Sequence, residues 1–421
     1  MGRIVFHIDV NSAFLSWEAV YRLDVMGEAE DIRMNCAAIG GDESMRHGIV
    51  LAKSEKAKAF GVKTGEALMI ARRKCPELTV YSPRFDWYVQ CSNKLMEYLR
   101  GKCYALEQFS IDEAWCDMTG IVSDRNQAIE YAQKIASYVR DELHFTVNIG
   151  ISENKILAKM ASGFTKPDRI HTLFRDEIPE KMWKLPVAEL FYVGTATAKR
   201  LNEFGIYTIG QIAKVDRSII ASNFKKQGIV MHDYANGIDD TPVENQRAEL
   251  KGYGNSMTIP FDVTDMEQAK VVLLSLSETV SARIRAAKVK ASTLAVSYTD
   301  SDFNKKSKQM ILDKPSDITS EIYECSVKLL KELWNERCSL RLLGVHAVKI
   351  TREEFYQRNI FETQESDDKR KKQEKLDETI DSIRKKFGDN AIFRASYMDS
   401  EIPHISSGLS RMKDKQKQKN S

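Results

Sequence analysis

Residues 109–118 read Phe-Ser-Ile-Asp-Glu-Ala-Trp-Cys-Asp-Met, so two adjacent carboxylates, Asp112 and Glu113, stand in a largely apolar segment. The surrounding residues predict a buried strand over the whole stretch. A buried carboxylate without a partner is costly, and strands rarely carry acids in their apolar middle. The pair therefore indicates a site at which a bound group neutralises the two charges.

A second predicted strand, over residues 3–9, ends in a third acid. Its residues alternate between two faces. One face would carry Ile4, Phe6 and Ile8, and the other Val5, His7 and Asp9. Two acidic segments far apart in the chain can thus meet in one sheet.

Three oxygen donors without a soft ligand are typical of a magnesium site. Converging carboxylates repel one another and need cations to stay ionised together. Two divalent ions about 3.5–4 Å apart can stabilise both the attacking and the leaving oxygen of a phosphoryl displacement. From the acids alone an alternative is equally compatible, in which Asp112 and Glu113 form a polar hairpin turn and Asp9 caps a strand end.

The predicted strand also fixes which way each side chain points, because neighbouring strand residues face opposite sides. Ile111 and Trp115 are expected to face the covering helices, and Asp112 to share the open side with Asp9. Glu113 would then point into the core. We predict that a tight turn or bulge around Glu113 brings it to the open side.

Composition indicates a multidomain chain with true cores. The 421 residues are 43% hydrophobic and correspond to roughly three domains. No apolar run approaches the ~18 residues of a membrane span. The start at Met1 runs directly into a strand pattern, so a signal peptide is not expected. The seven cysteines form no CxxC pair and are expected to be free thiols in a cytoplasmic protein (Cys36, Cys75, Cys91, Cys103, Cys116, Cys325 and Cys338).

Apolar periodicity predicts a crossover unit, in which a helix over 126–143 connects the strand at 109–118 to a strand at 146–151. An α/β sheet backed by helices is expected there. Further elements predicted near it are a helix at 12–26, a strand at 48–52, and helices at 54–60 and 66–74.

The second half of the chain changes pattern. Residues 168–240 are expected to be helical, and Asp239–Asn245 to be a linker. A β-α-β-β-α-β order, the ferredoxin-like signature, follows at 250–259, 265–287, 292–299, 307–312, 317–336 and 341–350. The last ~70 residues are charged and are expected to be mostly flexible, with one amphipathic helix.

Residues 283–308 hold seven basic and two acidic side chains, a local excess of five positive charges in a chain of net charge +3. Such a stretch can bind a polyanion. On composition alone a solvated helix face with a polar turn is the favoured interpretation.

Three more blocks accompany the acids: Asp-Val-Asn-Ser-Ala-Phe over 9–14, the lysine-rich Ala52–Gly65, and Gly-Ile-Ser-Glu-Asn-Lys from Gly150 leading to Lys166-Pro167. In order and spacing, the set resembles the Y-family translesion DNA polymerases over residues 1–350. Within the family, Ala52–Gly65 resembles the UmuC-like (polymerase V) branch most, with DinB-like (polymerase IV) members near.

The resemblance implies a multidomain α+β right-hand polymerase with a ferredoxin-like palm, small fingers, a helical thumb containing a helix–hairpin–helix, and a βαββαβ little finger. The implied domains are the palm at 1–18 and 78–167, fingers at 19–77, thumb at 168–240, a linker at 241–248, the little finger at 249–350 and a flexible tail at 351–421.

It also implies roles for individual residues. Asp9 and Asp112 would bridge two Mg²⁺ ions, Glu113 would bind the catalytic ion, and the Val10 carbonyl would complete the nucleotide-bound site. Phe14 matches the steric gate that excludes a ribose 2′-OH. Two lysines match cations that hold the incoming triphosphate (Lys58 and Lys166).

The chain departs from the family pattern at three places. DinB-like members carry Tyr and Arg where this chain has Glu55 and Lys58. The single ammonium group of Lys58 thus replaces an arginine guanidinium group, which can form two parallel hydrogen bonds. Trp115 stands where Tyr or Phe is usual. In the segment 190–210, which resembles a helix–hairpin–helix, Tyr192 replaces the first glycine, which leaves an ordinary helical hairpin as the alternative.

Contacts to DNA are expected from backbone amides at the hairpin and from phosphate-binding side chains. The residues concerned are Gly194 and Lys199 in the thumb and Arg283, Arg285, Lys288 and Lys290 in the little finger. Gln357, Ile360 and Phe361 resemble a degenerate sliding-clamp peptide, although a tail without a partner is as compatible.

These expectations define a low-fidelity, template-directed DNA polymerase for translesion synthesis in DNA repair and the SOS response. It would use two Mg²⁺ ions, primer–template DNA and dNTPs, with a sliding clamp and accessory mutagenesis proteins as further partners. The alternatives are a non-catalytic DNA-binding subunit and another two-metal nucleotidyl transferase or cyclase. The intact acids Asp9, Asp112 and Glu113 argue against the first alternative. The segment that resembles a helix–hairpin–helix and the basic βαββαβ domain argue against the second, since a cyclase does not need to bind duplex DNA.

Overall fold

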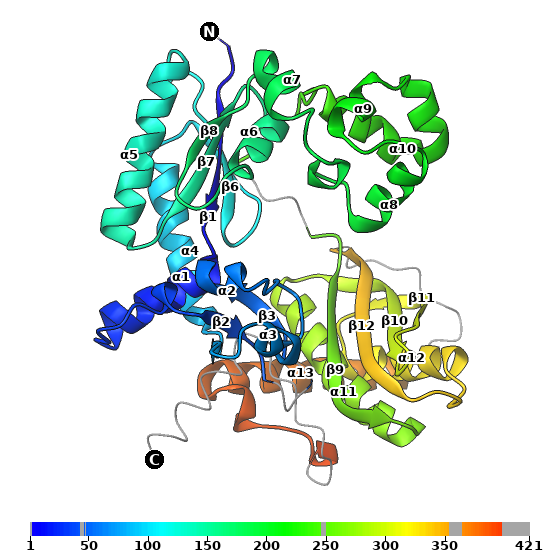
Figure 1. Cartoon of the computed structure of the whole chain (residues 1–421). Coiled ribbons are helices and arrows are strands. Elements are labelled where there is room, and N and C mark those ends of the chain that lie inside the picture. Colours follow the sequence, from blue (N-terminus) through cyan, green and yellow to red (C-terminus); the bar gives the residue numbers. More distant parts are fainter. Residues whose placement is uncertain (1, 43–45, 47, 246–249, 353–363, 398–421) are drawn as a thin grey trace. The chain divides into compact units, whose positions relative to one another are not determined.

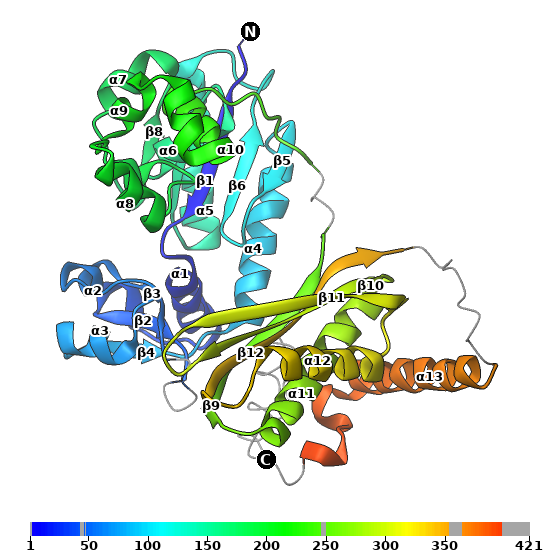
Figure 2. The same cartoon turned by 90° about the vertical axis from the view of Figure 1, so that its right-hand side faces the viewer.

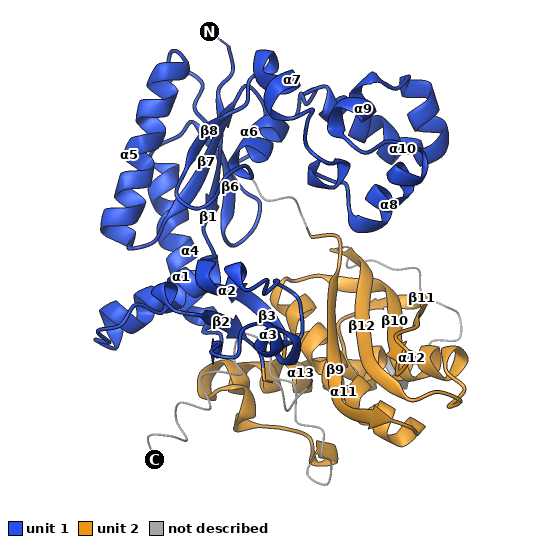
Figure 3. Ribbon diagram, viewed as in Figure 1, with its two compact units in different colours: residues 1–41, 49–248 blue, residues 42–48, 249–421 orange. Residues whose placement is uncertain are grey.

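The computed structural model describes residues 2–42, 46, 48–245, 250–352 and 364–397. The chain forms two compact units, which are described separately below (Figure 3). Unit 1 comprises residues 1–41 and 49–248, and unit 2 comprises residues 42–48 and 249–421.

Unit 1 is built on a five-stranded sheet in the order β5-β6-β1-β7-β8. Its strands are β1 (Val5–Val10), β5 (Ala105–Gln108), β6 (Glu113–Asp117), β7 (Val147–Ser152) and β8 (Ile170–Thr172). The third of the first four strands, β6, lies between the first two, which is the ferredoxin-like arrangement that the resemblance implies. Helices α4 (Phe85–Arg100) and α5 (Arg125–Leu143) cover one face, and α6 (Lys155–Ser162) packs on the other (Figure 1).

The alternation predicted for the first strand is confirmed. Phe6 and Ile8 are fully buried in the core beneath α4 and α5. His7 and Asp9 point to the opposite face, where α6 lies. The sheet is therefore apolar on one side and carries ionisable groups on the other.

The prediction of one continuous strand over 109–118 is wrong. The segment is the turn and second arm of a β5–β6 hairpin, and β6 begins only at Glu113. The amides of Phe109 and Ser110 both donate to the Glu113 carbonyl, at 3.0 and 3.2 Å. Asp112 accordingly lies in the turn, as the polar-hairpin alternative proposed, while Glu113 is already in the ladder.

The predicted distortion at Glu113 is also wrong, because Glu113 pairs in regular antiparallel register with Asp9. Directly opposed residues share a face, so Glu113 joins Asp9 without any bulge. The bend lies before Glu113 and shifts the alternation by one residue. Ala114 is therefore in the core beneath α4 and α5, whereas Trp115 contacts α6 through a hydrogen bond from its Nε1 to the Lys155 carbonyl.

A three-stranded sheet in the order β3-β2-β4 forms a smaller part of unit 1. Its elements are α1 (Ala13–Val20), a π-helix (Tyr21–Val25), a 3₁₀ turn (Ile32–Met34), β2 (Ala37–Gly40), β3 (Val50–Lys53), α2 (Glu55–Ala59), α3 (Leu68–Lys74) and β4 (Thr79–Tyr81). The predicted helices and the strand near 48–52 are confirmed. Strands β2 and β4 were missed because three or four residues carry too short a pattern.

Residues 173–240 are helical, as predicted, although the short strand β8 lies within the segment assigned to helices. The elements are two 3₁₀ turns (Arg175–Glu177 and Val187–Glu189), α7 (Ile178–Lys181), α8 (Thr195–Glu203), α9 (Ile209–Lys214) and α10 (Arg217–Ala235). Tyr192, which replaces a family glycine, adopts a φ of 73°. The turn thus keeps the left-handed backbone that glycine favours, and Gly194 is the N-cap of α8.

The stretch read as a linker is anchored to unit 1 over its described part. Thr241 accepts a hydrogen bond from Arg3 at 2.7 Å, and Asn245 accepts one from the Leu106 amide at 2.8 Å. Val243 is buried against Trp115. The predicted linker is thus held against unit 1 up to residue 245.

Unit 2 confirms the predicted β-α-β-β-α-β order. Its elements are β9 (Tyr253–Val263), α11 (Met266–Ala286), β10 (Lys290–Asp300), β11 (Lys305–Ser316), α12 (Thr319–Leu333) and β12 (Leu340–Thr351). The sheet order is β11-β10-β12-β9, so the last strand lies between the first two and the topology is not ferredoxin-like. Both helices pack on one face of the sheet (Figure 2).

The one amphipathic helix predicted in the tail is confirmed, and ion pairs dock it although the tail was expected to be mostly flexible. Helix α13 (Gln364–Phe387) is followed by two 3₁₀ turns, Asp389–Ala391 and Ala395–Tyr397. Arg285 of α11 forms ion pairs with Asp381 at 2.7 Å and Asp377 at 3.2 Å. These pairs were missed because α13 is held largely by charges, and a charged sequence resembles a disordered one.

Arg285 holds α13 in place, and this argues against its predicted role in DNA binding. Its side chain is only 12% exposed, and its pKa is raised above the usual value because the hydrogen bond and charge of Asp381 outweigh the opposing effect of burial. We predict that Arg285→Ala speeds amide hydrogen exchange in α13 by about 10²-fold, because breaking a buried pair leaves two carboxylates uncompensated. Lys308→Ala is the matched control, since its pair with Glu332 is exposed. Unchanged exchange in α13 of the Arg285→Ala protein would contradict this assignment.

The clamp-peptide residues Gln357, Ile360 and Phe361 lie outside the described residues. None of the helices in the described part of the chain combines the length and the apolarity needed to cross a membrane.

Candidate active site

Asp9 at the end of β1 and Glu113 at the start of β6 face each other across the ladder. Their side chains are 15% and 20% exposed and lie on the face that α6 covers. Two carboxylates in this position repel each other unless cations lie between or beside them. The sheet register therefore creates a site that attracts positive charge.

Two lysines neutralise this pair. Lys166 Nζ lies 2.6 Å from Asp9 Oδ1, and Lys159 Nζ lies 2.7 Å from Glu113 Oε2. Lys166 was among the predicted site residues, but Lys159 was not. Lys155 and Lys159 are four residues apart and so share one face of α6, but this spacing does not indicate that the face meets an acid.

Burial raises the pKa of Asp9 to about 6, against the opposing charge and hydrogen bond of Lys166, and Glu113 adds to the rise. Ionisation of Asp9 is thus less favourable in the folded chain than in the unfolded chain. At pH 7 the raised pKa lowers the free energy of unfolding, because the unfolded chain ionises this carboxyl more readily. Binding of a cation would reverse that effect.

His7 is fully buried beside the acids and was not among the predicted site residues. Burial, followed by the charges of Lys159 and Lys166, lowers its pKa well below the usual value, so the ring is neutral. Its Nδ1 is 2.7 Å from Ser162 Oγ and its Nε2 is 3.5 Å from Lys159 Nζ. The neutral ring therefore lies against the ammonium group of Lys159.

Close packing of α6 on the sheet positions the lysines. A Cβ at Gly150 of β7 would lie 2.0 Å from the Ala158 carbonyl oxygen, so only glycine lets the helix approach this closely. The segment after α6 is tied down by the buried Asn148, whose amide donates to the Ser162 and Thr165 carbonyls at 3.2 and 2.9 Å. Lys166 follows directly in the chain.

Asp112 is held by the hairpin turn. Its carboxylate accepts a hydrogen bond from the Ser110 hydroxyl at 2.5 Å, and its carbonyl accepts the Val10 amide at 3.1 Å. The turn thus carries Asp112 alongside Val10, one residue beyond Asp9. The backbones of the predicted ligands Asp9, Val10, Asp112 and Glu113 therefore lie next to one another at one end of the β1–β6 pair.

Phe14, the predicted steric gate, is half-buried in α1 within an aromatic cluster. Its ring stacks on Tyr88, with centroids 5.1 Å apart and an interplanar angle of 16°. Phe85 approaches edge-on at 5.8 Å. Contacts on two sides hold the ring in one orientation, four residues after the strand that ends in the site.

Lys58, predicted to bind the triphosphate, is not brought to the acids by the contacts described. Its Nζ lies 3.2 Å from Glu55, and both side chains are 53% exposed. The pair is a surface ion pair, which contributes little to stability. Lys58 can therefore leave Glu55 at low cost.

The predicted DNA-contact residues differ in their surroundings. Lys199 is exposed on α8, whose N-cap Gly194 is also exposed. Arg283 donates to the Gly254 carbonyl at 3.1 Å, and Lys290 lies 3.8 Å from Glu374 of α13. Lys288, two residues after the end of α11, has a φ of 56°.

A hollow of about 750 Å³ opens over the acids in unit 1. The hollow is lined by Asp9, Glu113 and the two lysines that pair with them. Residues of the helical segment, including Phe191 and Lys181, also line it. The charged end of the β1–β6 pair is thus open to a ligand.

Comparisons with known proteins agree with this geometry. A family model described as impB/mucB/samB family matches residues 8–163, and the model of that family's C-terminal domain matches residues 250–360. The DNA polymerase IV of Clostridium acetobutylicum is 43% identical over 401 residues, covering 95% of this chain and 100% of that protein. The DNA polymerase IV of Bacillus velezensis is 33% identical over 403 residues, covering 95% and 94%.

Two solved structures share the fold. A Y-family DNA polymerase chimera, Dbh-Dpo4(243-245)-Dbh, has a TM-score of 0.70 at 23% identity and covers 82% of this chain and 98% of its own. DinB from Sulfolobus solfataricus has a TM-score of 0.53 at 24% identity, with the same coverage. The two curated relatives carry the polymerase IV name, whereas Ala52–Gly65 had pointed most closely to the polymerase V branch.

Proposed function

We propose a catalytic assignment on the premise that this chain belongs to the impB/mucB/samB family and is a Y-family translesion DNA polymerase. Its substrates are template DNA and dNTPs. The observation that carries the assignment is the opposition of Asp9 and Glu113 in one register pair, where each carboxylate already binds a cationic side chain.

The donor set fits two Mg²⁺ ions. Asp9, Glu113 and Asp112 supply carboxylates, and Val10 supplies a carbonyl, all hard oxygen ligands. Burial disfavours the negative charge of Asp9 and raises its pKa, so a bound cation would be favoured there. When bound, the ions would stabilise the attacking primer 3′-oxygen and the leaving pyrophosphate.

The two lysines beside the acids, Lys159 of α6 and Lys166 after it, are proposed to act differently. Lys166 is 34% exposed at the rim of the hollow, so its ammonium group can turn from Asp9 to a phosphate oxygen. Lys159 is only 14% exposed and is supported by His7, so it stays near Glu113. We assign Lys166, and Lys58 of helix α2, to binding of the incoming triphosphate.

The domain assignment stays a proposal, with residues 1–18 and 78–167 as the palm, 19–77 as the fingers, 168–240 as the thumb, 241–248 as a linker and 249–350 as the little finger. Two strands cross these boundaries, since β4 pairs with β2 of the smaller sheet and β8 pairs with β7 of the large sheet. Helix α13, docked through Arg285, extends the little finger beyond its proposed end. A clamp contact through Gln357, Ile360 and Phe361, and accessory mutagenesis proteins, stay predictions.

We predict that Lys166→Met lowers kcat/KM for dNTP insertion by about 10- to 100-fold, because one charge-assisted hydrogen bond to the triphosphate is lost. Single-nucleotide insertion on a fixed primer–template measures it. Lys134→Met, on the exposed side of α5, is the control and keeps wild-type kinetics. Equal kcat/KM for the Lys166 and Lys134 variants would remove Lys166 from the nucleotide site.

A further inference from the structure

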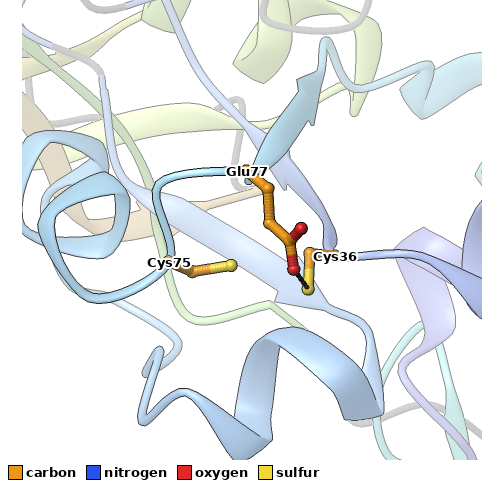
Figure 4. A group of neighbouring side chains, drawn as sticks. All are labelled: Cys36, Cys75 and Glu77. Atoms are coloured by element: carbon orange, nitrogen blue, oxygen red, sulfur yellow. Dashed lines mark hydrogen bonds between the residues drawn. The ribbon is translucent and has the colours of Figure 1, made fainter.

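A cluster of metal-ligating side chains lies in the smaller sheet of unit 1, apart from the carboxylates of the catalytic site. Cys36 precedes β2, Cys75 ends α3, and Glu77 lies in the connection from α3 to β4 (Figure 4). One ligand atom from each, two sulfurs and one carboxylate oxygen, lie within 4.8 Å of one another. Cys36 Sγ donates a hydrogen bond to Glu77 Oε1 at 3.1 Å.

The backbone holds these three side chains in place. The Thr79 amide donates to the Cys36 carbonyl at 2.9 Å as β2 and β4 begin their parallel pairing, and the Leu78 amide donates to the Cys75 carbonyl at 3.0 Å. Both cysteines belong to the buried core of this sheet. The two cysteines are therefore held by the backbone at the ends of β2 and α3, and Glu77 lies in the short connection between α3 and β4.

Burial differs among the three. Cys36 is 6% exposed and Cys75 is fully buried, whereas Glu77 is exposed. The hydrogen bond to Glu77, with burial, raises the pKa of the Cys36 thiol to about 12. Without a cation Cys36 is thus a neutral thiol beside a carboxylate, and the group opens to solvent on the Glu77 side.

We propose that Cys36, Cys75 and Glu77 bind one soft divalent cation of the zinc class. Two sulfurs and one carboxylate are a set that Zn²⁺ accepts, and hard Mg²⁺ does not favour sulfur. Both thiols lose their protons to solvent as two sulfur–metal bonds form. Water reaching the exposed side of Glu77 supplies the fourth ligand of a tetrahedron.

Such a cation would tie together three segments of a small domain. The start of β2, the end of α3 and the loop before β4 would share one ion, so that local unfolding of this sheet requires its release. The site would be structural, since the catalytic acids lie on β1 and β6 of the other sheet.

The test uses reduced, full-length protein freed of metal with a chelator, then titrated with Co²⁺ in excess Mg²⁺, which keeps the carboxylate site filled. Cobalt bound to thiolates gives a sulfur-to-metal charge-transfer band in the ultraviolet, which cobalt on carboxylates lacks. We expect one such Co²⁺ per chain, displaced by Zn²⁺, and a higher melting temperature with Zn²⁺.

Three variants locate the site. Cys36→Ser and Cys75→Ser lose the band and the melting shift, and Glu77→Gln, at an exposed position, weakens Co²⁺ binding by about ten-fold or more. Cys91→Ser, a buried thiol of α4, is the control and keeps both signals. Absence of the band in the wild type, or its persistence in Cys36→Ser and Cys75→Ser, overturns the proposal. Because the band does not depend on nucleotide addition, this outcome is separate from that of the polymerase assignment.

Discussion

Asp9→Asn and Glu113→Gln each lower the rate of nucleotide addition by at least about 10³-fold, because the charges that stabilise the transition state are removed. The affinity for primer–template DNA stays near that of the wild type, since phosphate contacts elsewhere supply it. Single-turnover insertion with a gel-shift titration on the same preparation measures both quantities.

The fold should survive these changes. Asp9→Asn removes a carboxyl whose pKa is raised by burial, so at pH 7 the free energy of unfolding does not fall. Asp117→Asn is the matched control, because Asp117 lies at the other end of β6 and accepts a hydrogen bond from the Thr119 amide at 2.9 Å. If Asp9→Asn and Asp117→Asn insert nucleotides equally fast, the acids have been assigned wrongly.

Phe14→Ala raises ribonucleotide insertion relative to deoxyribonucleotide insertion by roughly 10²-fold. Contacts with Tyr88 and Phe85 fix the Phe14 ring, so its volume, when it lies under the sugar, cannot move aside for a 2′-OH. Truncation to alanine removes that obstruction. The measurement is the ratio of kcat/KM for rNTP to that for dNTP with the same template base.

Using a ratio removes the effect of any loss of folded protein, which matters because Phe14 packs against the core of unit 1. Phe14→Tyr is the control, because it keeps the ring and therefore the discrimination. A ratio in Phe14→Ala that equals the wild-type ratio would show that the ring lies elsewhere than under the sugar.

Much of the fold could be predicted because apolar periodicity decides which face of an element is buried. The sequence predicted the alternation of Phe6 and Ile8 with His7 and Asp9. It also predicted the six elements from β9 to β12 in unit 2. The strand order in unit 2 was not, because it depends on which strands pair across the domain. Local sequence contains no such information.

Glu113 faces the open side as predicted, but the way in which the backbone brings it there was predicted wrongly, for a specific physical reason. Ile111 made the turn look like part of a buried strand, so the start of β6 was placed too early. An error in where a strand starts reverses every side chain assigned to it. The residues of the site were nevertheless correct, because Glu113 and Asp112 both reach the end of the β1–β6 pair, one through the ladder and one through the turn.

Lys159 and His7 could not have been found from the sequence alone. Each is an ordinary residue in its own element, and their role comes from the contact of α6 with β1 that Gly150 permits. The docking of α13 was not predicted for a similar reason, since Arg285 and Asp381 lie 96 positions apart in the sequence. Contacts between distant segments are what the structure adds.

The most direct test of the two-metal site is a crystal structure of the protein with a dideoxy-terminated primer–template, the matching dNTP and Mn²⁺, in which anomalous scattering locates the ions. Two Mn²⁺ ions are expected, both contacted by Asp9 and Asp112 and one also by Glu113. To reach them, Asp112 must release the Ser110 hydroxyl that it binds in the metal-free chain. A single ion, or two ions with Asp112 still bound to Ser110, would contradict the assignment.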